Sequence, residues 1–215
     1  MAPTRSEWFR IPLRPEDFLD SKRVALVMWD MQKGLAGHAI GIDRIRTAAK
    51  TLISAADDVG IPVIWSRHIL PPLHLIAGPF LLFLMKKQKV SHPSQLTPQM
   101  QRGMEDVEFV DGLQPSSNHI VLEKSQPSLF IDTPLDLRLK TLGRDTIVVA
   151  GVATDIGVEF TCRHAAALGY YSVVVEDATG SYSSKSHERS LEFLRNWTTL
   201  VLDSQSICKH WRSAN

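Results

Sequence analysis

The sequence predicts an α/β fold in which a parallel sheet of about six strands lies between helices on both faces. Short apolar runs alternate with amphipathic segments along the chain, which is typical of a parallel sheet covered by helices. The first run, over residues 24–29, is continuously apolar, as expected for a strand buried on both faces. With 215 residues, 44% of them hydrophobic, the chain can bury one core. We therefore expect a single three-layer, Rossmann-like domain over residues 1–215.

The expected elements follow in order. Apolar runs predict six strands, over residues 24–29, 61–65, 119–123, 145–151, 171–177 and 198–204. Helical spacing predicts a helix from residue 42 to about 56, with Gly60 as its stop. Further helices are expected near 132–142, opened by Asp132 and Thr133, over 156–168, closed by Gly169, and after the polar stretch 181–190.

Two segments lie outside this alternation. Residues 1–21 form an N-terminal arm, and residues 70–118 have no clear period, so they are expected to be an excursion from the sheet. The excursion begins with an apolar run of about 13 residues. This run is too short to span a membrane, because a transmembrane helix needs ~20 residues. This run has three interpretations, in decreasing order of weight: an interface in a homodimer or homotetramer, a lid over an apolar substrate, or core.

The composition excludes several classes of protein. The 24 basic and 23 acidic residues are spread along the chain, so no basic face for nucleic acid is expected. The first 20 residues lack the apolar core of a signal peptide, which favours a cytoplasmic location. The two cysteines, Cys162 and Cys208, suit neither a disulfide framework nor a zinc site. No cofactor is expected.

Polar residues follow four of the expected strands, where ligands bind in open parallel sheets. They are Asp30, Lys124, the segment GVATDIG over 151–157, and the pair Glu176 and Asp177. Any one of these could be a helix cap or a surface charge. Together they predict a functional site at the carboxyl edge of the sheet.

Three motifs in these places resemble the isochorismatase-like hydrolases, over roughly residues 22–182. Asp30 and Gln32 are similar to the D-x-Q motif of that family, and Lys124, Ser128 and Phe130 to its lysine and S-x-F segment. The segment 151–157 is similar to G-[VI]-x-T-[DN]-x-C except at its last position, where Gly157 stands in place of the nucleophilic cysteine. The resemblance implies the same α/β fold and a hydrolase of small molecules.

The resemblance also implies roles for individual residues. Asp30 and Lys124 become the catalytic pair, and a cis peptide bond is expected between Val152 and Ala153. The backbone N–H groups of Ala153 and Gly157 become an oxyanion hole. Val152, Thr154 and Asp155 then support this loop, with Asp155 also a candidate helix N-cap, while the pocket is lined by Gln32, His68 and Phe130.

Gly157 changes the chemistry that the resemblance implies. Without a side chain at this position, no thioester can form there. Cys162 lies ~140° around the helix from Gly157, so the expected role of Cys162 is packing. Isochorismatases proper also carry a glycine here and hydrolyse a vinyl ether with no covalent intermediate. In that mechanism Asp30 protonates the enol ether carbon, Lys124 assists it, and water adds to the cation.

The segment after the second strand bears on substrate and metal. It is apolar apart from Arg67, His68 and His74, so a fairly apolar substrate is favoured over a dicarboxylate. His68 and His74 have the spacing of the metal-binding histidines of the nicotinamidase branch, but Ser66 stands where that branch has an aspartate. We expect no metal.

Three hypotheses follow. The first is a cofactor-free hydrolase that uses Asp30 and Lys124, either on a vinyl ether or by water attack on an ester or amide. The second is a catalytically inactive homologue that binds a ligand. The third is an amidohydrolase whose cysteine has been replaced at Gly157.

Overall fold

The computed structural model describes residues 14–197 and 199–213 and contains a six-stranded, fully parallel sheet. The strand order is β3-β2-β1-β4-β5-β6, so the chain starts in the middle, builds one half of the sheet and then returns to build the other. The strands are β1 Val24–Trp29, β2 Val63–His68, β3 Ile120–Lys124, β4 Thr146–Val152, β5 Tyr171–Gly180 and β6 Thr199–Leu202. The predicted fold class is confirmed.

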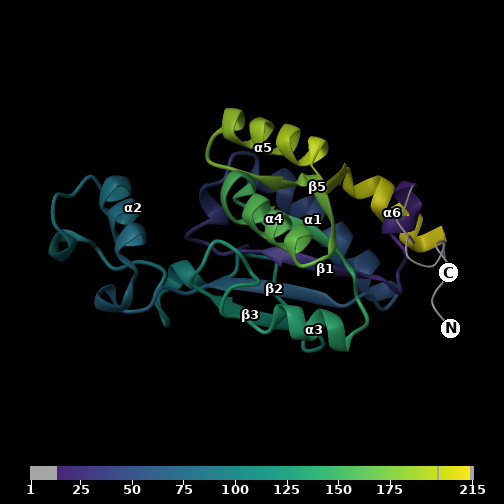
Figure 1. The fold of residues 1–215 in the computed structure, drawn as a ribbon, viewed down its shortest axis with the longest axis horizontal. Helices are drawn as coiled ribbons and strands as arrows, with labels where there is room; N and C mark the ends of the chain where they lie inside the picture. The colour runs from purple at the N-terminus through teal and green to yellow at the C-terminus, as the bar shows by residue number, and fades with distance from the viewer. Residues whose placement is uncertain (1–13, 198, 214–215) are drawn as a thin grey trace, which may run out of the picture.

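Helices cover both faces of the sheet (Figure 1). One face packs against α1 (Ile42–Asp58) and α6 (Ser204–Ser213), and the other against α3 (Leu135–Thr141), α4 (Glu159–Ala167) and α5 (Ser184–Asn196). Side chains of β1 alternate between these layers because successive residues of a strand point to opposite faces. Leu26 and Met28 join the α1 side, and Val27 and Trp29 the α4 side.

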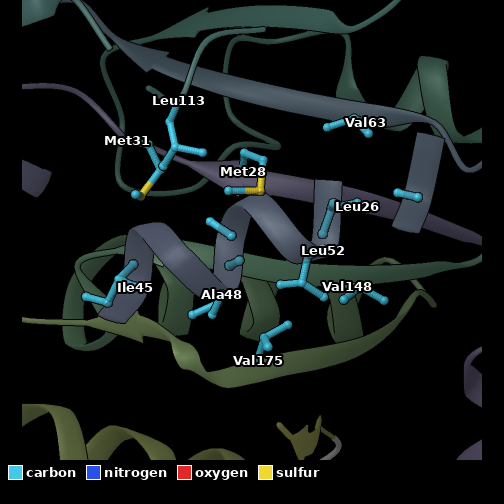
Figure 2. Packing of buried hydrophobic residues seen from close by; sticks show 14 of the residues in the cluster. Leu26, Met28, Met31, Ile45, Ala48, Leu52, Val63, Leu113, Val148 and Val175 are labelled. Carbon is cyan, nitrogen blue, oxygen red and sulfur yellow. The ribbon is translucent and has the colours of Figure 1, made fainter. Parts of the chain in front are cut away.

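Leu52 lies in the middle of the α1 layer and is fully buried (Figure 2). Leu52→Ala is expected to lower the free energy of unfolding by about 2–5 kcal/mol, because it removes apolar contacts and leaves a cavity. The control is Leu137→Ala on α3, where the leucine is 62% exposed; it should change stability by less than about 0.5 kcal/mol. Urea unfolding of both variants checks this, and equal losses would contradict the assigned core.

Two helices were not anticipated from the sequence. Helix α6 follows β6 directly, and its N-terminus is held by Asp177, which accepts hydrogen bonds from the Ser204 N–H and Oγ–H at 2.8 and 2.6 Å. Helix α2 (Gly78–Gln88) lies inside the excursion, where the apolar residues gave no clear helical period. Helix α3 begins at Leu135, later than predicted, and Thr133 accepts a hydrogen bond from the Leu135 N–H at 3.2 Å.

The excursion stands beyond the end of the sheet, with α2 away from the other helices (Figure 1). It has a small core of its own, formed by Leu70, Ile76, Leu84, Leu96, Met100 and Val107. Of the predicted N-terminal arm, residues 1–13 lie outside the described residues, and Pro15–Phe18 form a short 3₁₀ turn. Within the described ranges, none of the helices is long and apolar enough to cross a membrane.

Candidate active site

The candidate site lies at the carboxyl ends of β1 and β4, which are neighbours in the sheet. Strands β2 and β3 extend from one side of β1, and β4 begins the other half. This reversal of strand order separates the connections that leave the two strands and opens a crevice between them. Asp30 directly follows β1, and residues 153–158 directly follow β4, so two of the predicted motifs meet here.

Asp30 and Lys124 form a buried ion pair. The Lys124 Nζ lies 2.5 Å from Asp30 Oδ2, and the two side chains are only 3% and 5% exposed. Ser66 on β2 donates its hydroxyl to the other carboxylate oxygen, Oδ1, at 2.5 Å and accepts the Asp30 N–H at 2.8 Å. In the sequence, Ser66 was noted only because it stands where a metal-binding aspartate would be. In the structure it is the residue that orients Asp30.

Burial lowers the pKa of Lys124, and the charge and hydrogen bond of Asp30 oppose this effect. The ammonium also lies 4.4 Å from the centroid of the Trp29 ring, within range of a cation–π contact. Lys124 is therefore held by a carboxylate and an aromatic face, with little water around it. An ammonium in such a place gives up its proton more readily than one in solution.

His68, at the end of β2, completes this group. Its Nδ1 lies 3.3 Å from Lys124 Nζ, and its ring meets Phe80 of α2 edge-on, with centroids 6.4 Å apart. Burial, followed by the positive charge of Lys124, lowers the pKa of His68 to about 4. The imidazole is therefore neutral near pH 7.

The depressed pKa of His68 makes stability depend on pH. The unfolded chain, with an ordinary value of 6.5, binds a proton that the folded protein does not bind until about pH 4. Stability from this residue is therefore complete above pH 6.5 and is lost as pH falls to about 4, by at most about 3 kcal/mol.

The measurement is urea unfolding from pH 7.5 to 4. His68→Gln is expected to remove this part of the pH dependence, so that its stability relative to wild type improves as the pH falls. His74→Gln, at an exposed position in the excursion, is the matched control and should follow the wild-type curve. Parallel curves for wild type and His68→Gln would contradict the prediction.

The third motif adopts the expected backbone. The peptide bond between Val152 and Ala153 is cis, and residues 154–158 form one π-helical turn before α4 begins at Glu159. Within the described residues, the Ala153 N–H donates no backbone hydrogen bond, whereas its carbonyl accepts from Ile156 and Val158. The Ala153 N–H is thus available to a ligand.

Thr154 and Asp155 connect this turn to the end of β5. The Thr154 hydroxyl donates to the Gly180 carbonyl at 2.9 Å and lies 2.8 Å from His187 Nδ1. Asp155 accepts a hydrogen bond from the Ser181 hydroxyl. The prediction that Asp155 caps a helix is wrong: α4 follows Val158 and has no side-chain cap.

A cavity of about 590 Å³ opens above the ion pair. Its floor includes Asp30 and Lys124, and one wall is the Ala153–Gly157 backbone. Residues of the excursion, among them Phe80, Leu84 and Met100, also line the cavity. Apolar side chains dominate the lining: Trp29, Leu35, Leu70, Phe80, Phe83, Leu84, Met100, Val152, Ile156 and Phe160.

A few polar groups also reach the cavity. Lys87 comes from α2, Asp106 from the end of the excursion, and Tyr182 from the segment after β5. Partial desolvation raises the pKa of Tyr182, which is still 41% exposed, and the negative charges of Asp30 and Asp155 add to this effect. Its hydroxyl therefore remains a hydrogen-bond donor at neutral pH.

Several residues singled out from the sequence lie elsewhere. Gln32 is fully buried and does not line the cavity; its amide binds the backbone of His68 and Val107. Phe130 stacks on Tyr170, with ring centroids 5.5 Å apart, and is also absent from the lining. Both were expected in the pocket, but Gln32 bonds to backbone groups and Phe130 packs on a neighbouring ring.

The remaining strand-end and cysteine residues also have structural places. Glu176 pairs with Arg195, and Asp177 holds α6, because β5 continues past both to Gly180. Cys162 is fully buried, and burial raises the pKa of its thiol to about 12, as expected for a packing residue. Among the described residues no three His, Cys, Asp or Glu side chains form a metal-binding group.

Comparison with known proteins identifies the family of the chain. A family model described as "Isochorismatase domain" matches residues 24–206. The chain is 30% identical over 216 residues to the ureidoacrylate amidohydrolase RutB of Methylobacterium radiotolerans, covering 91% of this chain and 84% of that protein. It is also 30% identical over 213 residues to RutB of an Enterobacter species, covering 90% and 93%. The chain belongs to the isochorismatase family of hydrolases.

Solved structures share the fold. A cysteine hydrolase from Pseudomonas syringae superposes with a TM-score of 0.81 at 23% identity, covering 91% of this chain and 95% of that one. At this level of identity the likeness is one of architecture. The chain and that protein therefore share their fold.

Proposed function

We propose that the protein hydrolyses a small, fairly apolar molecule without forming a covalent bond to it, and that Asp30 and Lys124 are the acid–base pair. The observation that carries the proposal is their buried ion pair at the floor of an apolar cavity, beside the backbone of Ala153 and Gly157. A charged pair in such a place is costly to bury, and perturbed pKa values cluster at functional sites.

Two reactions suit this arrangement. With a vinyl ether, the proton of the Lys124–Asp30 hydrogen bond passes through the Asp30 carboxyl to the terminal carbon, and water adds to the resulting cation. A proton returns to the pair as the hemiketal collapses to a ketone and an alcohol. With an ester or amide, Asp30 takes a proton from a water molecule while the oxygen of that water bonds to the carbonyl carbon. The N–H groups of Ala153 and Gly157 then stabilise the oxyanion, and the leaving group departs with a proton.

The apolar lining favours a substrate with few charges, because each charge would lose its hydration on entry. Lys87 and Lys124 are the cations in the lining, and Lys124 is already paired with Asp30. A dicarboxylate would therefore find one cation, at the excursion side. An amide of the kind named in the ureidoacrylate amidohydrolases belongs in the first set of substrates to test.

The test is a screen of amides, including ureidoacrylate, and of esters, lactones and enol ethers, with mass detection of products. The enzyme proposal expects a product and no acylated protein in intact-mass spectra during turnover. The rival proposal, an inactive homologue that binds a ligand, expects saturable binding with no product in any class. A trapped acyl adduct on the protein would overturn the non-covalent mechanism.

The proposed assembly is a homodimer or homotetramer. Its support is the exposed apolar surface of the excursion, where Leu75 is 65% exposed, Leu82 58% and Phe83 46%. Sedimentation velocity is expected to show a dimer or tetramer that Leu82→Glu shifts towards monomer. The matched control, Leu137→Glu on α3, should leave the assembly unchanged, and a monomeric wild-type protein would contradict the proposal. The cytoplasmic location stays a prediction.

A further inference from the structure

Trp29 occupies the space that a side chain at position 157 would need. A Cβ atom built on Gly157 would lie 2.0 Å from the Trp29 Nε1, 2.2 Å from Cε2 and 2.4 Å from Cζ2. All three distances are far inside van der Waals contact. Gly157 does not have a positive φ, so its backbone conformation is open to any residue. The indole, and not the backbone, is what excludes a side chain here.

The indole has little freedom to move aside. Trp29 is the last residue of β1, is 1% exposed, and its backbone pairs with Gly151 of β4. Its ring packs in the layer between the sheet and α4, and its face carries the Lys124 ammonium. Displacing the ring would therefore disturb both the packing and the ion pair with Asp30.

The indole also brings a donor to the cavity. Trp29 lines the cavity, and in the described part of the chain its Nε1–H has no hydrogen-bond partner. Trp211 gives the contrast: its Nε1 is fully enclosed and unpartnered, whereas Trp29 Nε1 is not among such enclosed atoms. A buried indole N–H usually has a partner, so the Trp29 donor is left for a ligand.

We infer that Trp29 takes the place of a nucleophilic side chain in this site: its edge excludes any side chain at position 157 and its Nε1–H donates to an acceptor oxygen of the substrate. The inference rests on the proposed function for the identity of that oxygen, an ether or acyl oxygen in an otherwise apolar molecule. It makes Trp29 a specificity-determining residue and ties Gly157 to it as a pair. Restoring a thiol at position 157 then also requires a smaller residue at position 29.

The steric part is tested by a double-mutant cycle in thermal unfolding, which needs no substrate. Gly157→Ala in the wild-type background is expected to lower Tm by roughly 2–12 °C, because overpacking a core is costly. In the Trp29→Val background, the same change should lower Tm by less than about 2 °C. Trp29→Leu is the second background, in case the valine variant does not fold.

Gly37→Ala is the matched control, since a Cβ there meets nothing within 4 Å and Gly37 has no positive φ. It should leave Tm unchanged in every background. An equal loss from Gly157→Ala with and without Trp29, or no loss with Trp29 present, would overturn the inference. Because the readout is stability alone, this result is independent of whether the protein proves to be a hydrolase.

The donor part is tested by hydrogen exchange of the indole N–H groups, followed by NMR on ¹⁵N-labelled wild-type protein. Trp29→Phe assigns the Trp29 resonance by its loss. The Trp29 N–H is expected to exchange at least tenfold faster than the enclosed Trp211 N–H, since Trp29 lines the cavity and its Nε1 is not among the fully enclosed atoms. Exchange as slow as that of Trp211 would show that the donor is not presented to a ligand.

Discussion

Asp30→Asn is expected to reduce turnover of the substrate found in the screen by roughly a hundredfold to ten-thousandfold, the usual contribution of a positioned acid or base. The amide keeps the size of the carboxyl group and can still accept the Ser66 hydroxyl, but it cannot carry the proton. The measurement is kcat and KM for both proteins. The loss should appear mainly in kcat, because the proton moves in the reaction and not in binding.

The control for Asp30→Asn is Asp177→Asn. Asp177 also lies near a strand end but holds α6 and does not line the cavity. Its replacement should leave kcat within about twofold of wild type. If Asp30→Asn retained wild-type turnover, the acid–base assignment would be wrong.

Lys124→Met is expected to have the second large effect, on both activity and stability. Methionine is similar in length but leaves the Asp30 carboxylate buried without its counter-charge, and breaking a buried pair in this way typically costs about 3–5 kcal/mol. Turnover should fall by a factor similar to that of Asp30→Asn. Chemical unfolding and steady-state kinetics give the two readouts.

The double variant, Asp30→Asn with Lys124→Met, tests whether the two residues act together or independently. It should be more stable than the sum of the single losses predicts and hardly less active than either single variant, because the two groups act on one proton. The control pair is Lys140 with Asp136, an i,i+4 surface pair at 2.8 Å, where Lys140→Met should cost no more than about 0.5 kcal/mol. Additive losses at Asp30 and Lys124 would contradict the shared role.

The strands were predictable because their signal is local. A run such as Val24–Trp29 is apolar throughout, and a strand buried on both faces needs no more than that. The strand ends then placed Asp30, Lys124 and the 151–157 segment at one edge of the sheet. The excursion was not predictable in the same way, because α2 packs into a small separate core and exposes Leu82 and Phe83, so its apolar residues show no single face.

The site was predictable as a set of motifs but not as a set of contacts. Gln32 and Phe130 belong to the motifs, yet the first ties the ends of β1 and β2 together and the second packs on Tyr170. Ser66 and Trp29 are in contact with the ion pair and gave no signal of their own. Their roles depend on which side chains of neighbouring strands face each other, and that register is fixed only by the folded sheet.

The separate core of the excursion means that part of the cavity lining can change without touching the two layers that pack on the sheet. The sheet is packed by the layers on its two faces, whereas the wall of the cavity formed by Leu70, Leu84 and Met100 belongs to the 70–107 cluster. Substitutions in that wall can therefore reshape the entrance without weakening β1 or β4.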